Sequence, residues 1–184
     1  MFDPIYVTNR KITDGDFLSH LEKIVSHHPA AVILREKDLS EEAYLNLAKE
    51  AGAICGRYGV PFIVHTFLKT AITIKAEAIH LPLPALRKMK PGDKACFKRI
   101  GASVHSLSEA KEAEALGATY LIAGHIFATD CKKDLPPRGL DFLKEICRET
   151  ALPVYAIGGV SKEKIPELKR SGASGACIMS GLAR

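Results

Sequence analysis

Short apolar segments alternate with segments of helical periodicity along almost the whole chain, and this alternation constrains the fold more than any other feature of the sequence. Eight of the apolar runs have the length of buried strands. Strands separated by helices pair in parallel through right-handed crossovers. The predicted strands are Ile5–Thr8, Ala31–Arg35, Pro61–His65, Ala78–Leu81, Gly101–His105, Tyr120–His125, Val154–Gly158 and Ala176–Ser180.

Helices between these strands are indicated by apolar residues three and four positions apart. One helix is predicted to begin after Ser40, an N-cap residue, and to bury one face over residues 43–54. Another is predicted after Ser106, where Glu109 stands at the capping-box position and Gly117 marks the end. Each predicted strand is therefore followed by a helix, except the last.

Eight strand–helix units in succession predict a (β/α)₈ TIM barrel, formed by residues 1–184 as a single domain. A doubly wound sheet is the alternative, but no Gly-x-Gly-x-x-Gly motif follows the first strand. The chain ends at Arg184, four residues beyond the last predicted strand, so the barrel is expected to lack its final helix. We expect a partner subunit in a homodimer to cover that flank, because it would otherwise expose apolar surface.

Composition limits the partners and the compartment. The longest apolar runs are far shorter than the roughly 20 residues that cross a bilayer, and Asp3 stands where a signal peptide would carry bases. A cytoplasmic protein with no membrane partner is expected. The net charge of +5 includes no basic run with interleaved aromatics, which favours a small anionic ligand over nucleic acid. The five cysteines form no zinc-like pattern, so we expect reduced thiols and no metal site.

Polar side chains gather where the predicted strands end, which is the rim that carries the active site in such a barrel. Two glycine-rich turns, after the seventh and eighth strands, favour phosphate binding because backbone N–H groups can approach the oxygens there. The rim residues are Arg35, Glu36, Lys37, His65, Thr66, His105, His125, Thr129, Cys131 and Lys132, and the turns hold Gly158, Gly159, Ser180 and Gly181. His80 and His105 are expected to satisfy backbone groups, and His65 either lines the rim or packs.

Five motifs occur in order along nearly the whole chain. They are Arg-Glu-Lys at 35–37, Gly-x-Ser-Val-His at 101–105, Gly-His-x-Phe-x-Thr-Asp-Cys-Lys-Lys at 124–133, Ala-Ile-Gly-Gly at 156–159 and Met-Ser-Gly at 179–181. In these motifs the chain resembles the superfamily of thiamine-phosphate synthases and TenI-type thiazole tautomerases. The resemblance implies a (β/α)₈ barrel, usually dimeric, that acts on thiazole phosphates in thiamine biosynthesis.

Two departures from the synthase pattern favour the tautomerase branch. The resemblance implies that synthases bind a pyrimidine pyrophosphate with Mg²⁺, through Asn-Asp after the third strand and Gly-Gln-x-Asp after the fourth. Here these places read His65-Thr66 and Pro82-Leu83-Pro84. In the loop after the sixth strand, His125 replaces a proline and Cys131 replaces a threonine. We therefore expect a metal-independent isomerase without a cofactor.

The tautomerase reaction, as the resemblance implies, aromatises a dihydrothiazole carboxylate phosphate to 2-(2-carboxy-4-methylthiazol-5-yl)ethyl phosphate by proton transfer. His125 is the expected base and acid, because imidazole titrates near neutrality. Arg35 and Lys37 are expected to bind the substrate carboxylate, and Lys37 to assist catalysis. The remaining expected contacts to this small phosphorylated thiazole carboxylate are Thr129, Cys131, Lys132, Gly158, Gly159, Ser180 and Gly181.

Two other functions stay open at this point. One is a thiamine-phosphate synthase, which joins thiazole phosphate to pyrimidine pyrophosphate with Mg²⁺, with a divergent metal site. The other is a TenI-like barrel that binds or regulates without turnover.

Overall fold

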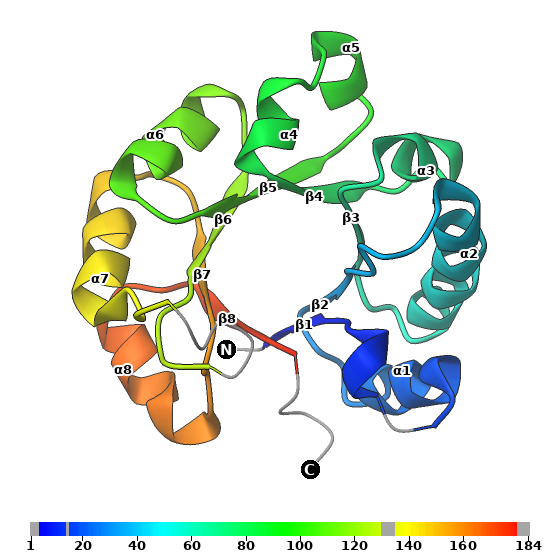
Figure 1. The fold of residues 1–184 in the computed structure, drawn as a ribbon, viewed down its shortest axis with the longest axis horizontal. Helices are drawn as coiled ribbons and strands as arrows, with labels where there is room; N and C mark the ends of the chain where they lie inside the picture. Colours follow the sequence, from blue (N-terminus) through cyan, green and yellow to red (C-terminus); the bar gives the residue numbers. More distant parts are fainter. Residues whose placement is uncertain (1–3, 14, 130–134, 180–184) are drawn as a thin grey trace.

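The computed structural model describes residues 4–13, 15–129 and 135–179, which form a closed barrel of eight parallel strands. Each strand pairs with the next in the chain, and β8 pairs with β1. Figure 1 looks down this barrel, with the strands as an inner ring and the helices outside it. The strands are β1 Ile5–Val7, β2 Ala31–Leu34, β3 Phe62–His65, β4 Ala78–Pro82, β5 Arg99–Val104, β6 Tyr120–Gly124, β7 Val154–Ile157 and β8 Gly175–Ile178.

Helices connect the strands in the predicted order and cover the outside of the ring. The connection between β4 and β5 holds two helices of four and five residues, since the chain is short there. The α-helices are α1 Phe17–Val25, α2 Glu41–Arg57, α3 Leu68–Thr73, α4 Leu83–Arg87, α5 Pro91–Lys94, α6 Leu107–Ala115, α7 Gly139–Glu149 and α8 Ile165–Arg170, with 3₁₀ turns at η1 Arg10–Ile12 and η3 Lys162–Lys164.

The predicted helix starts are confirmed by their hydrogen bonds. Ser40 Oγ accepts from the N–H of Ala43 at 3.2 Å, and Ser106 Oγ accepts from the N–H of Glu109 at 3.1 Å. The carboxylate of Glu109 accepts from the backbone N–H of His105 at 2.6 Å, one residue before the N-cap. The start of α6 is thereby tied to the end of β5, which belongs to the pocket described below.

Alternate residues of each strand face two separate layers of the core. One layer lies between the strands and the helices and includes Tyr6, Val32 and Val64. The other fills the inside of the barrel and includes Ile5, Ile33 and Tyr120. A polar residue at an inward position therefore faces the barrel interior, and near a strand's C-terminal end it faces the rim.

The predicted (β/α)₈ barrel is confirmed, and every predicted strand is present with its ends shifted by two residues at most. No helix follows β8 among the described residues, and 180–184 lie outside them. In the described part of the chain, no helix has the length and apolar character needed to cross a membrane. The expected homodimer stays a prediction.

Candidate active site

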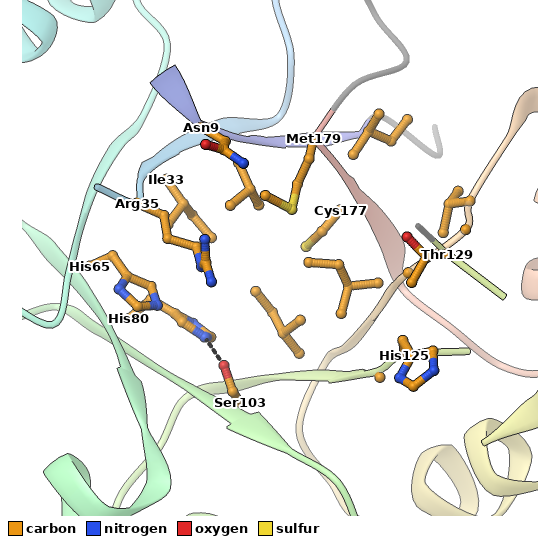
Figure 2. A pocket seen from close by; sticks show the side chains of 18 of the residues that line it. Asn9, Ile33, Arg35, His65, His80, Ser103, His125, Thr129, Cys177 and Met179 are labelled. Atoms are coloured by element: carbon orange, nitrogen blue, oxygen red, sulfur yellow. Dashed lines mark hydrogen bonds between the residues drawn. The ribbon is translucent and has the colours of Figure 1, made fainter. Parts of the chain in front are cut away.

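A cavity of about 620 Å³ opens at the C-terminal ends of the strands, inside the ring of the barrel. Figure 2 shows the side chains around it, with His65 and His80 on one side and His125 on the opposite side. Six predicted site residues line it, namely Arg35, Lys37, His125, Thr129, Gly158 and Gly159. The other four, Cys131, Lys132, Ser180 and Gly181, lie outside the described residues.

The charge of the cavity wall is positive. Arg35 and Lys37 follow β2 and both line the cavity, whereas no aspartate or glutamate is among its described lining residues. The guanidinium of Arg35 points into the cavity in Figure 2. Two cations without a lining carboxylate make this wall suited to a ligand with several negative charges.

Glu36 stands between these two cations and is buried, with 2% of its surface exposed. Its carboxylate accepts a hydrogen bond from Thr8 Oγ1 at 2.6 Å and bonds from the backbone N–H of Arg10 at 3.2 Å. Arg10 Nε also donates to it at 3.3 Å. These bonds tie the segment after β1 to the segment after β2, on which Arg35 and Lys37 are carried.

Tyr44 of α2 holds the ends of β2 and β3 together. Its buried hydroxyl donates to the carbonyl of Leu34 at 2.6 Å and accepts from the N–H of His65 at 3.0 Å. The Tyr44 ring stacks on Phe67 with centroids 3.9 Å apart. The predicted amphipathic helix therefore also positions two strand ends at the rim.

His65 lies on the cavity wall, which decides between the two roles considered for it in favour of lining. Burial, then the neighbouring His80, and then the charges of Lys37 and Arg35 lower the pKa of His65 to about 2. Its Nδ1 bonds with Thr66 Oγ1 at 2.7 Å. At neutral pH this imidazole is therefore uncharged and adds no charge to the cationic wall.

His80 was expected to satisfy a backbone group, and this expectation is wrong. Its Nε2 lies 2.8 Å from Ser103 Oγ, and its Nδ1 lies 3.2 Å from the hydroxyl of Tyr120. His105, by contrast, donates from Nδ1 to the carbonyl of Gly124 at 2.7 Å, as predicted. The sequence analysis did not identify Ser103 and Tyr120 as site residues. Strand alternation could have placed both of them, with His80, inside the barrel.

His125 is 5% exposed and anchors the loop that follows β6. Its Nε2 donates to the carbonyl of Leu135 at 3.1 Å, and its own carbonyl accepts from the N–H of Arg138 at 2.9 Å. A Cβ added to Gly158 would overlap the Cβ of His125. The histidine thus packs between the loop and the glycine turn after β7.

The turn after β7 consists of two glycines that line the cavity. Gly158 and Gly159 have φ angles of 97° and 62°, which residues with a Cβ rarely adopt. The carbonyl of Gly158 accepts from the N–H of Phe127 at 3.0 Å, and that of Gly159 accepts from Lys164 Nζ at 2.8 Å. Both carbonyls are therefore held by protein donors at the cavity edge.

The described residues do not form the kind of Mg²⁺ site that the resemblance to synthases implies, with carboxylates after the third and fourth strands. Mg²⁺ takes hard oxygen ligands, usually carboxylates, but the ends of β3 and β4 present His65 and Pro82 to the cavity. The nearby carboxylate of Glu36 is occupied by Thr8 and Arg10. No cluster of three or more His, Cys, Asp or Glu side chains suited to a metal occurs within the described ranges.

Comparison with known proteins identifies related enzymes. A thiamine-phosphate synthase of Syntrophomonas wolfei is 34% identical over 183 residues, which cover 96% of this chain and 86% of the relative. One of Caldivirga maquilingensis is 38% identical over 148 residues, covering 80% and 72%. The structure of a thiamine phosphate pyrophosphorylase from Pyrococcus furiosus matches with a TM-score of 0.82 at 26% identity, covering 97% and 86%.

These relatives overturn the expectation of an isomerase, because they bear the name of the synthase, so the assignment to a thiazole tautomerase is wrong. The assignment rested on the missing carboxylates after the third and fourth strands and on His125 and Cys131 in the loop after the sixth. The structure gives a physical reason to discount His125, since its Nε2 is occupied by the Leu135 carbonyl and holds the loop.

The wider pattern of motifs is better evidence than that loop. A family model described as thiamine monophosphate synthase matches residues 5–182, which include all eight strands and the whole rim. The chain therefore belongs to the thiamine monophosphate synthase family.

Proposed function

We propose that this protein is a thiamine-phosphate synthase, which couples a thiazole phosphate to a pyrimidine pyrophosphate. The observation that carries the proposal is the pairing, in one cavity, of the cations Arg35 and Lys37 with the glycine turn Gly158–Gly159. Two phosphorylated substrates need two anion-binding regions around one reaction centre. The names and coverage of the relatives support the same reaction.

The reaction forms one bond and breaks another. The thiazole nitrogen attacks the methylene carbon of the pyrimidine, and the bond from that carbon to the pyrophosphate oxygen breaks. Pyrophosphate leaves with the electron pair, so negative charge grows on the leaving oxygen. Arg35 and Lys37, on the cavity wall, stabilise this charge.

The other end of the cavity holds the thiazole phosphate in this proposal. Gly158 and Gly159 present backbone to the phosphate, and Thr129 lies in the same wall. Cys131, Lys132, Ser180 and Gly181 stay predicted contacts outside the described residues. His125 supports this end by holding the loop through Leu135 rather than by moving protons.

No step is assigned to Mg²⁺, because the described donor set does not fit it. Residue Lys37 acts here as a charge and not as an acid or base. The expected homodimer and the cytoplasmic location stay predictions, and sedimentation at micromolar concentration tests the first of them.

The test is the formation of thiamine phosphate from thiazole phosphate and pyrimidine pyrophosphate, measured by chromatography with and without added Mg²⁺. We expect product from the wild-type chain and at least a tenfold lower rate from Arg35→Met. Arg87→Met is the matched control, because Arg87 pairs with Glu112 on the outer surface. Binding of both substrates without any product would overturn the proposal and leave a binding protein.

A further inference from the structure

Three polar side chains from neighbouring strands form a hydrogen-bonded line below the cavity. Tyr120 of β6 bonds to His80 of β4 at 3.2 Å, and His80 bonds to Ser103 of β5 at 2.8 Å. The dashed line in Figure 2 marks the second of these bonds. Ser103 and His80 both line the cavity, so the line runs from the buried interior to the cavity wall.

The backbone register of the barrel makes this line possible. His80 is the Cα partner of Gly101 in the β4–β5 pair, and Gly101 is the Cα partner of Tyr120 in the β5–β6 pair. The two side chains therefore meet directly across Gly101. A Cβ at Gly101 would overlap both the Tyr120 ring and His80 Nδ1. The glycine leaves room for one hydrogen bond between two large side chains.

The protonation states of the two rings are fixed by their surroundings. Burial, with a smaller contribution from the charge of Lys37, lowers the pKa of His80 to about 3. Burial also raises the pKa of Tyr120 well above its usual range. At neutral pH His80 therefore carries a single N–H, and Tyr120 keeps its hydroxyl proton. A neutral imidazole has one donor nitrogen and one acceptor nitrogen.

The direction of the hydrogen bonds follows from the need to place the Tyr120 proton. Among the described residues, His80 Nδ1 is the one acceptor within hydrogen-bond distance of that hydroxyl. If Nδ1 carried the proton instead, the buried phenol would have a donor without an acceptor, which is unfavourable. Tyr120 therefore donates to Nδ1, and the N–H at Nε2 donates to Ser103 Oγ. The Ser103 proton is then directed away from His80.

We infer that Tyr120 and His80 are positioning residues that make the Ser103 hydroxyl a hydrogen-bond donor into the cavity. The ligand must then present an acceptor atom at Ser103, either a phosphate oxygen or an unprotonated ring nitrogen. Under the proposed function, both kinds of acceptor belong to the pyrimidine pyrophosphate. The orientation of the Ser103 proton itself does not depend on that function.

The first experiment uses the ligand-free protein and tests the direction of the line alone. Protein labelled with ¹⁵N in histidine is studied by two-bond ¹H–¹⁵N correlation at pH 7, and His80 is assigned from the signals lost in His80→Gln. We expect protonated Nε2 and unprotonated Nδ1 in the wild type. Tyr120→Phe should move His80 toward a mixture of the two tautomers. Protonated Nδ1 in the wild type would overturn the inference whether or not the protein is a synthase.

The second experiment measures binding, with inorganic pyrophosphate in one arm and the phosphate-free aminopyrimidine alcohol in the other. Ser103→Ala and Tyr120→Phe should each weaken the binding of one probe about three- to tenfold. That probe is pyrophosphate if Ser103 donates to a phosphate oxygen, and the aminopyrimidine alcohol if Ser103 donates to a ring nitrogen. The double variant should bind as Ser103→Ala does, because Tyr120 acts through Ser103. Multiplied effects in the double variant, or unchanged binding in both arms, would overturn the inference.

Tyr155→Phe is the matched control for the loss of a tyrosine hydroxyl. Tyr155 packs edge-to-face against Tyr120, with ring centroids 5.8 Å apart, and lies inside the same barrel. We expect this variant to keep the wild-type affinity for both probes and the wild-type tautomer of His80. A loss of binding as large as that of Tyr120→Phe would assign the effect to packing and would count against the inference.

Discussion

The carboxylate of Glu36 accepts a 2.6 Å hydrogen bond from the hydroxyl of Thr8, and the bond joins the segment after β2 to the segment after β1. The same Thr8 oxygen accepts from the backbone N–H of Arg35 at 2.9 Å. The Thr8 hydroxyl thus bonds to both Glu36 and Arg35. The carboxylate of Glu36 is buried, whereas Arg35 and Lys37 on either side of it line the cavity. These bonds connect the segment that carries Arg35 and Lys37 to the segment after β1.

Glu36→Gln should therefore damage both stability and anion binding. The amide presents N–H groups where the carboxylate accepts several bonds, so the unfolding free energy should fall by about 1–3 kcal/mol. Binding of inorganic pyrophosphate should also weaken, because the segment that carries Arg35 loses its anchor. Urea denaturation and calorimetry measure the two effects.

Asp38→Asn is the control for this substitution, since Asp38 also pairs with Arg10 but is 41% exposed. The stability of this variant should change much less than that of Glu36→Gln, as expected for an exposed ion pair. Equal losses in the two variants would contradict the anchoring role of Glu36.

The cationic wall should give pyrophosphate binding a marked dependence on salt. Arg35→Met or Lys37→Met should each weaken binding of inorganic pyrophosphate by about tenfold or more, as expected for a lost charge-assisted bond of about 1.5–3 kcal/mol. The remaining affinity should fall less steeply with added salt than in the wild type. Calorimetry at two salt concentrations measures this, and an unchanged salt dependence in both variants would contradict it.

Features of this structure that depend on local sequence could be predicted, whereas features that depend on contacts between distant residues could not. The strands and the rim were predictable, because alternation and periodicity are local properties of the chain, and Arg35 and Gly158 were found from them. The line through His80 was not, since it depends on the register of β4, β5 and β6, which local periodicity does not give. Function was misassigned in part because His125 was interpreted from the residue it replaces, whereas its side chain bonds to the carbonyl of Leu135, ten residues away.

The two buried imidazoles make stability depend on pH in a calculable direction. In the unfolded chain His65 and His80 bind protons below pH about 6.5, whereas in the folded chain their pKa values are about 2 and about 3. Between these limits the unfolded state binds more protons. The unfolding free energy is therefore fully maintained above pH 6.5 and falls with decreasing pH, by up to about 1.4 kcal/mol per pH unit for each imidazole.

Urea denaturation between pH 7 and pH 5 tests this dependence above the range in which most carboxylates titrate. His80→Gln should show a shallower decrease than the wild type, whatever its absolute stability. His27→Gln is the control, because His27 is exposed, and it should keep the wild-type slope. Equal slopes for His80→Gln and the wild type would mean that His80 does not contribute to acid sensitivity.

Two glycines with similar backbone angles but different surroundings separate strain from packing. Gly158 has a φ of 97° and Gly117 a φ of 86°. A Cβ at Gly117 meets no atom within 4 Å, whereas a Cβ at Gly158 would overlap His125. Gly117→Ala should therefore cost only the left-handed backbone conformation, about 1–2 kcal/mol. Gly158→Ala should cost that amount plus about 1–3 kcal/mol for the overlap.

The difference between these two variants in urea denaturation measures how rigidly His125 is held against the turn. The Gly158→Ala variant should also bind inorganic phosphate more weakly, because moving His125 would disturb both the turn and the bond from Nε2 to Leu135. Gly117→Ala should leave phosphate binding unchanged, since Gly117 ends α6 away from the cavity lining. Equal losses of stability in Gly158→Ala and Gly117→Ala would show that the loop after β6 moves to accommodate the added Cβ. His125 would then not hold the glycine turn in place.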